Sequence, residues 1–70
     1  MKLKKMKMLL SEAQANRTTV VLLSDDSNYS FKDIMCNSKY KSLRKLQITQ
    51  FDTNQNGQLL IMIDDTVLND

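Results

Sequence analysis

The stretch "FDTNQNGQLLIMIDD", residues 51–65, decides the fold, because its two halves are typical of different structures. The first half resembles the start of an EF-hand calcium loop that begins at Asp52. Positions three, five and six of that loop are Asn54, Asn56 and Gly57. Position twelve, which must supply a bidentate carboxylate, is Ile63, and both flanks are strand-like rather than helical. A calcium-binding module is therefore only the third alternative for this chain, and a calorimetric titration tests it.

The second half of the stretch favours a β-hairpin. Asn56-Gly57 stands between two apolar, β-rich runs, and both residues accept the positive φ that a tight turn requires. We predict an outgoing strand over residues 45–51 and a returning strand over residues 58–64.

The register of this hairpin depends on the length of its loop. A three-residue loop that ends at Gly57 places Phe51 opposite Ile61. The same loop places Thr49 opposite Ile63. A two-residue loop shifts the register by one residue, which reverses the side chains that face the core. The sequence leaves both registers open.

A third strand is predicted over residues 18–24, "TTVVLLS", because the run is β-branched, apolar and too short for a helix. An unbroken apolar run is typical of a strand that is covered on both faces. We therefore expect the two apolar segments, residues 20–23 and 59–63, to lie side by side at the centre of the sheet.

Residues 2–15 predict an amphipathic helix. Leu3, Met6, Leu10 and Ala13 recur at helical spacing and form one apolar stripe. A domain of this size needs every apolar face for its core, so we expect the stripe to pack on the sheet and the lysines to face solvent. The expected class is α+β: one N-terminal helix on a mainly antiparallel sheet of three or four strands.

One helix covers one face of a sheet, and the other face also carries apolar residues. In the strand over residues 58–64, Leu60 and Met62 alternate with Leu59, Ile61 and Ile63 and point to that second face. Apolar surface left in water forfeits about 25 cal/mol per Å² and favours aggregation. We expect a homodimer contact, a protein partner or residues 27–44 to cover it.

The middle of the chain has weaker local signals. Residues 25–30, "DDSNYS", predict a turn. Ser30, followed three residues later by Asp33, is placed to cap a short helical turn through "FKDIM", residues 31–35.

A basic island occupies residues 37–45. Its candidate nucleic-acid contacts are Lys39, Tyr40, Lys41, Arg44 and Lys45. Charge is segregated along the chain, with a net charge of +4 in residues 1–17, −2 in 18–36, +4 in 37–47 and −4 in 48–70. Cations beside an aromatic ring can bind phosphates and stack on a base. A small nucleic-acid-binding protein is therefore the alternative function.

Composition argues against an enzyme. The chain has no His, one Cys and one Gly, which excludes imidazole chemistry, a Cys–His pair and a glycine-rich phosphate loop. We expect no catalytic residue, no cofactor and no bound metal.

Length and composition indicate a single soluble domain over residues 1–70. Apolar residues make up 41% of the chain and charged residues 26%, as in a folded domain. The lone Cys36 excludes an internal disulfide, which favours the cytoplasm. The apolar runs are far shorter than the about 20 residues of a membrane span, so we expect no membrane partner.

The order of elements resembles small bacterial and bacteriophage proteins of the α+β class. The likeness rests on an opening helix, "KLKKMKMLLSEA", a "VV" strand that ends in acids, and a closing hairpin that ends in "ID". It implies an accessory protein that works by binding a partner, in some cases as an inhibitor. The leading expectation is thus a non-enzymatic protein–protein interaction module.

Overall fold

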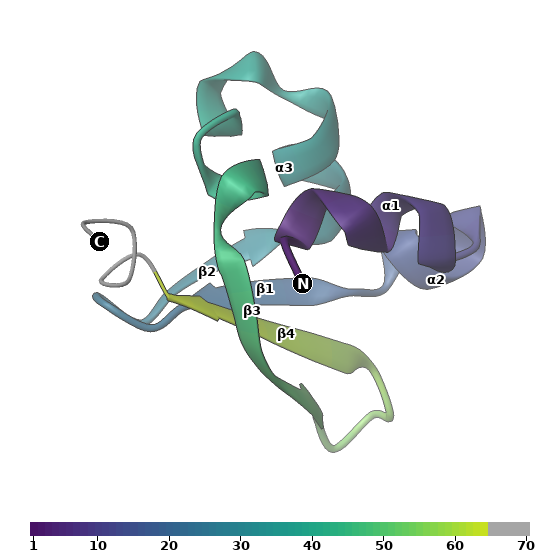
Figure 1. The fold of residues 1–70 in the computed structure, drawn as a ribbon. Helices are drawn as coiled ribbons and strands as arrows, with labels where there is room; N and C mark the ends of the chain where they lie inside the picture. Colours follow the sequence, from purple (N-terminus) through teal and green to yellow (C-terminus); the bar gives the residue numbers. More distant parts are fainter. Residues whose placement is uncertain (65–70) are drawn as a thin grey trace.

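The computed structural model describes residues 1–64 and confirms the α+β class. Four strands, β1 (Thr19–Leu22), β2 (Ser27–Ser30), β3 (Gln47–Thr53) and β4 (Leu59–Asp64), form one sheet in the order β2-β1-β4-β3. The helical segments are η1 (Leu3–Lys5), α1 (Met6–Leu9), α2 (Glu12–Asn16), α3 (Phe31–Cys36), η2 (Ser38–Tyr40) and η3 (Leu43–Lys45). Figure 1 shows α1 and α3 on the same side of the sheet.

The two apolar strands lie side by side at the centre of the sheet, as predicted. β1 and β4 pair in parallel, with Val20 beside Ile61 and Leu22 beside Ile63. These four side chains are at most 6% exposed and form the floor of the core. The two outer pairs, β1 with β2 and β3 with β4, are antiparallel. Within residues 1–64 the sheet is thus mixed, with one parallel and two antiparallel pairs, and is mainly antiparallel.

The closing hairpin has the three-residue loop, and its first predicted pair is confirmed. The Gly57 N–H donates to the Asn54 carbonyl over 3.0 Å, and the Asn54 N–H donates to the Gln58 carbonyl over 3.0 Å. Gly57 has φ of 76°, in the region that glycine adopts without steric cost. Phe51 pairs with Ile61. This register sends Ile61 into the core.

The second predicted pair of the hairpin is wrong. Ile48, rather than Thr49, lies opposite Ile63, because the ladder shifts between Ile48 and Gln50. The shift is a β-bulge, which inserts one extra residue into a strand. The Thr49 hydroxyl donates to the Met62 carbonyl over 3.3 Å.

The N-terminal helix is broken rather than continuous. Leu10 has an extended backbone, with φ of −100° and ψ of 137°, between α1 and α2. Ser11 then starts α2 with a capping box, in which its hydroxyl accepts from the Gln14 N–H and the Gln14 amide oxygen accepts from the Ser11 N–H. The break leaves Leu3 and Met6 in the core, while Met8 and Leu9 are 85% and 61% exposed. The lysines of the segment face solvent, as expected.

The predicted turn over residues 25–30 is confirmed at Asp25 and Asp26 and wrong at its last four residues, because residues 27–30 form the edge strand β2. The turn itself spans residues 23–26, and Asp26 adopts a left-handed backbone with φ of 59°. The Asp25 carboxylate accepts from the Ser27 N–H over 3.0 Å, and its hydrogen bonds with Ser27 lower the pKa of Asp25. Tyr29 pairs with Val20 and points to the covered face, which gives this polar strand its place in the sheet.

The helical turn predicted after Ser30 is present as α3, but the predicted cap is not. Ser30 makes no side-chain capping hydrogen bond. Instead, the Phe31 N–H donates to the Thr18 carbonyl over 3.0 Å, which ties α3 to the start of β1. The sheet thus supplies the acceptor for the first turn of the helix.

The segment between β2 and β3 covers the same face of the sheet as the N-terminal segment. Phe31, Ile34 and Leu46 are at most 1% exposed and pack with Leu3 in one core. Of the three alternatives for covering the second face, the one that used residues 27–44 is therefore wrong, since the helical part of this segment packs on the core side. No helix within residues 1–64 combines the length and the apolar character needed to cross a bilayer.

Candidate functional site

The second face of the sheet carries Leu60 and Met62, as the sequence predicted. Both side chains are partly buried by their neighbours, whereas Ile61 and Ile63, which alternate with them, are 0% exposed. Residues 1–64 place their buried core on the opposite side. We call this second side the open face of the sheet.

Two rows of side chains cross the open face. The first row is Asn28, Val21, Met62 and Gln50, and the second is Ser30, Thr19, Leu60 and Asp52. The central strands therefore supply Val21, Met62 and Leu60, while the edge strands supply polar groups. An apolar centre with a polar rim is the usual anatomy of a protein–protein contact.

The loop that resembles a calcium site is organised by its own hydrogen bonds. The Asn54 Oδ1 accepts from the Asn56 N–H over 2.9 Å and from the Gln58 N–H over 3.0 Å. Ile63, at the position of the bidentate ligand, is buried in the core, and both flanks are strands. Within residues 1–64, no three Asp, Glu, Cys or His side chains are grouped closely enough to hold a metal ion. The asparagine oxygen that the calcium pattern would use serves the turn instead.

Replacing Asn54 by alanine tests this structural role. We expect Asn54→Ala to lower the free energy of unfolding by about 1 kcal/mol, because two backbone N–H groups lose their acceptor. Gln55→Ala, in the same loop, is the control and should change it by less than about 0.5 kcal/mol. Urea denaturation followed by circular dichroism measures both. Equal effects of the two substitutions would contradict the assigned role.

Two of the five predicted nucleic-acid contacts, Tyr40 and Arg44, make contacts within the protein. Tyr40 is partly buried, and its ring meets that of Tyr29 edge to face at 5.3 Å, while the Lys39 ammonium lies 5.4 Å from the Tyr40 ring centre. The Tyr40 ring is therefore engaged on the protein itself and is not a free platform for a base. Lys39, Lys41 and Lys45 are exposed.

Arg44 closes the C-terminal end of α3. Its Nε–H donates to the Ile34 carbonyl over 2.7 Å, and its Nη2 group donates to the Asn37 carbonyl over 2.9 Å. A cation at the C-terminal end of a helix also interacts favourably with the helix dipole. Sequence spacing gave no sign of this contact, because Arg44 lies ten residues beyond Ile34.

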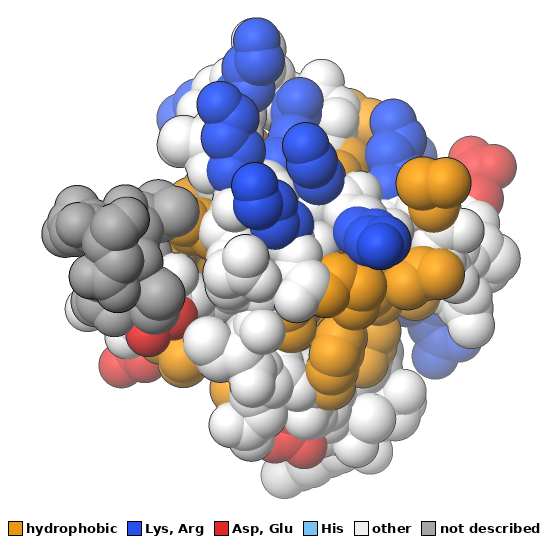
Figure 2. Space-filling model, in the orientation of Figure 1, with side chains coloured by type: hydrophobic (Ala, Val, Ile, Leu, Met, Phe, Trp, Pro, Cys, Tyr) orange, Lys and Arg blue, Asp and Glu red, His pale blue; other side chains and the backbone are white. Residues whose placement is uncertain are grey.

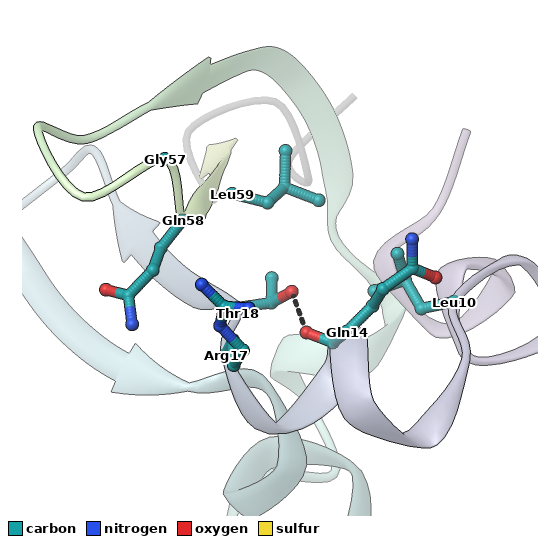
Figure 3. Close-up of a pocket in the computed structure, with 7 residues that line it drawn as sticks. All are labelled: Leu10, Gln14, Arg17, Thr18, Gly57, Gln58 and Leu59. Atoms are coloured by element: carbon teal, nitrogen blue, oxygen red, sulfur yellow. Dashed lines mark hydrogen bonds between the residues drawn. The ribbon is translucent and has the colours of Figure 1, made fainter.

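A small hollow lies between α2 and the β3–β4 loop (Figure 3). Its volume is about 180 Å³, and it is lined by Leu10, Gln14, Arg17, Thr18, Gly57, Gln58 and Leu59. The buried Thr18 hydroxyl donates to the Gln14 carbonyl over 2.7 Å, so its hydrogen is already used. Sites for drug-sized ligands usually measure about 300–1,000 Å³. The hollow is smaller than such a site.

Comparisons of the chain with protein families, with curated proteins and with solved structures gave no match.

Proposed function

We propose that this protein is a non-enzymatic binding module that docks a protein partner on the open face of its sheet. The observation that carries the proposal is that the central strands are apolar on both faces, while the helical segments of residues 1–64 pack on one. A half-solvated sheet normally alternates apolar and polar residues along each strand. β2 is polar on the open face, at Asn28 and Ser30. β1 and β4 instead depart from the rule there at Val21, Leu60 and Met62.

The partner that fits this face has an apolar contact surface with polar groups around it. Burying Val21, Leu60 and Met62 removes their remaining apolar surface from water, and each contributes about 1 kcal/mol since they are already partly buried. Asn28, Gln50 and the other rim residues supply hydrogen-bonding groups at the edges. A contact with only three apolar side chains at its centre is small, and small contacts are suited to reversible binding rather than to a permanent complex.

The resemblance to small bacterial and bacteriophage proteins supports an accessory role in the cytoplasm. In such a role the protein acts by occupying a surface of its partner, and inhibition of the partner follows from that occupation. Nothing in this role requires a cofactor or a catalytic group.

Substitution of the apolar centre tests the proposal. We expect Leu60→Thr with Met62→Thr to lower partner affinity by at least tenfold, because the contact loses its two largest apolar side chains. Asn28→Thr with Gln50→Thr, which changes two rim residues in the same way, is the matched control. Quantitative pull-down from the source cell with the three proteins, followed by mass spectrometry, measures the effect.

The expected result is at least one protein that the wild type and the rim variant retain and the Leu60/Met62 variant loses. If every captured protein binds the two variants equally, the open face is not the docking site. Sedimentation and an apolar dye complete the test: a stable monomer at high concentration that binds no dye would argue against any exposed apolar contact face. A dimer that the Leu60/Met62 variant cannot form would identify a second copy of the chain as the partner.

A further inference from the structure

The two basic segments of the chain, far apart in sequence, lie side by side in the fold. The Leu3 N–H donates to the Leu46 carbonyl over 2.9 Å, and the Ile48 N–H donates to the Met1 carbonyl over 2.8 Å. Lys2 and Gln47 form an antiparallel bridge between these two hydrogen bonds. The N-terminal segment is thereby fixed along the edge of β3, and η1 contacts η3.

This pairing produces one basic surface from two islands. We call it the basic face and define it by the exposed lysines Lys2, Lys4, Lys5, Lys41 and Lys45. Residues 1–10 and 37–48 contain no Asp or Glu, and they hold eight of the ten Lys and Arg residues of the chain. Figure 2 shows Lys and Arg gathered over α1 and the segment between α3 and β3.

The basic face is rigidly supported from below. Leu3 and Leu46 make one of the two hydrogen bonds between the segments, and both side chains are at most 1% exposed and pack in the core. Arg44 holds the second segment to the end of α3 through two backbone carbonyls. The spacing of the lysine backbones is therefore set by the fold, although the lysine side chains themselves reach into solvent.

We propose that the basic face binds the phosphate backbone of a nucleic acid without reading its sequence. The lysines supply the charge that phosphates require, and exposed polar side chains of the second segment, Ser38, Ser42 and Gln47, add hydrogen-bond donors that phosphate oxygens accept. Binding through bases is not part of the proposal, because the Tyr40 ring packs against Tyr29 and Lys39. The five lysines are not among the residues of the two rows that cross the open face.

A nucleic acid fits this surface better than an anionic membrane. Membrane-surface segments combine cations with apolar residues that enter the lipid. The exposed apolar residues here, Met1, Met8 and Leu9, all belong to the N-terminal segment, whereas Lys41 and Lys45 come from the other segment. A phosphate backbone can follow both segments, while lipid insertion at Met1, Met8 and Leu9 would engage the N-terminal segment alone.

Charge reversal in each of the two segments tests the proposal. The probe is a fluorescently labelled DNA duplex of 20 base pairs, and binding is measured by anisotropy. We expect Lys4→Glu with Lys45→Glu to weaken binding by at least tenfold. The matched control is Arg17→Glu with Lys32→Glu, which changes the net charge equally but at two exposed cations outside the basic face. The control should weaken binding by no more than about threefold, through long-range electrostatics.

The salt dependence provides a second measure. If five lysines neutralise phosphates, the affinity should fall about 500-fold between 50 and 200 mM salt, and the two reversals should reduce the logarithmic slope by about two. Circular dichroism and thermal melting show whether each variant is folded. Equal losses in the two double variants, or binding that is indifferent to salt, would overturn the proposal.

Vesicles rich in phosphatidylserine separate the two classes of polyanion. Binding to the vesicles that depends on Met8 and Leu9, with no binding to the duplex, would make the surface a membrane contact and overturn the nucleic-acid proposal. Leu60→Thr with Met62→Thr should leave DNA binding unchanged, so failure of the docking proposal and failure of this one give different results.

Discussion

Replacing Phe31 by alanine is expected to leave most of the protein unfolded at 25 °C. Phe31 is 1% exposed and packs in the single core beside Ile34 and Leu3. Removing a buried phenyl ring lowers the free energy of unfolding by about 3–5 kcal/mol. A domain of 70 residues has a total of about 3–5 kcal/mol from its core, so the loss consumes nearly all of it. Far-ultraviolet circular dichroism and urea titration measure the effect.

The other phenylalanine of the chain is the matched control. Phe51 is 47% exposed on β3, and Phe51→Ala should lower the free energy of unfolding by about 1 kcal/mol or less. A folded Phe31→Ala protein with the melting temperature of the wild type would show that α3 does not pack as described.

Replacing Arg44 by methionine should produce the next largest loss. The substitution keeps an apolar stem of similar length but removes both hydrogen bonds to the carbonyls of Ile34 and Asn37. Hydrogen bonds from charged donors contribute about 1.5–3 kcal/mol, and the partly buried position limits replacement by water. We expect the free energy of unfolding to fall by about 2 kcal/mol.

Two further variants separate geometry from charge at this position. Lys45→Met removes the neighbouring exposed cation and should change the free energy of unfolding by less than about 0.5 kcal/mol. Arg44→Lys keeps the charge but not the planar guanidinium group, so its free energy of unfolding should lie between those of Arg44→Met and the wild type. Full recovery by lysine, or an equal loss in Lys45→Met, would mean that charge alone explains the effect.

The parts of the fold that depend on local apolar pattern were predictable. The hairpin over β3 and β4 follows from Asn56-Gly57 between two β-rich runs, and the short apolar run of β1 could only form a strand. The central place of β1 and β4 follows from their apolar runs, because inner strands of a sheet are more buried than edge strands. The expectation that both faces of β1 are covered is not met, since the core lies on one side.

The parts that depend on tertiary contacts were not predictable. β2 is built from Ser, Asn and Tyr, which favour turns in isolation, and it forms because Val20 lies opposite Tyr29. The helix is interrupted at Leu10 because the capping box at Ser11 starts a new helix and competes with a continuous one. The bulge at Thr49 has no local signature at all.

The candidate surfaces also divide into one that the local pattern predicts and one that depends on tertiary contacts. Leu60 and Met62 were found from alternation along a single strand, which needs no knowledge of the fold. The union of the two basic islands was missed, because it depends on the contact of Leu3 with Leu46 across more than forty residues. The intramolecular contacts of Tyr40 and Arg44 were missed for a related reason, since their partners lie on other elements.

The most direct test of the account is whether water reaches one side of β4 and not the other. Methyl resonances can be recorded by nuclear magnetic resonance with a soluble paramagnetic probe, at a concentration where sedimentation gives the monomer mass of 8.1 kDa. The account predicts strong broadening of the methyl groups of Leu60 and Met62, and little broadening of those of Ile61 and Ile63. Equal protection of all four residues in the monomer would contradict an open face.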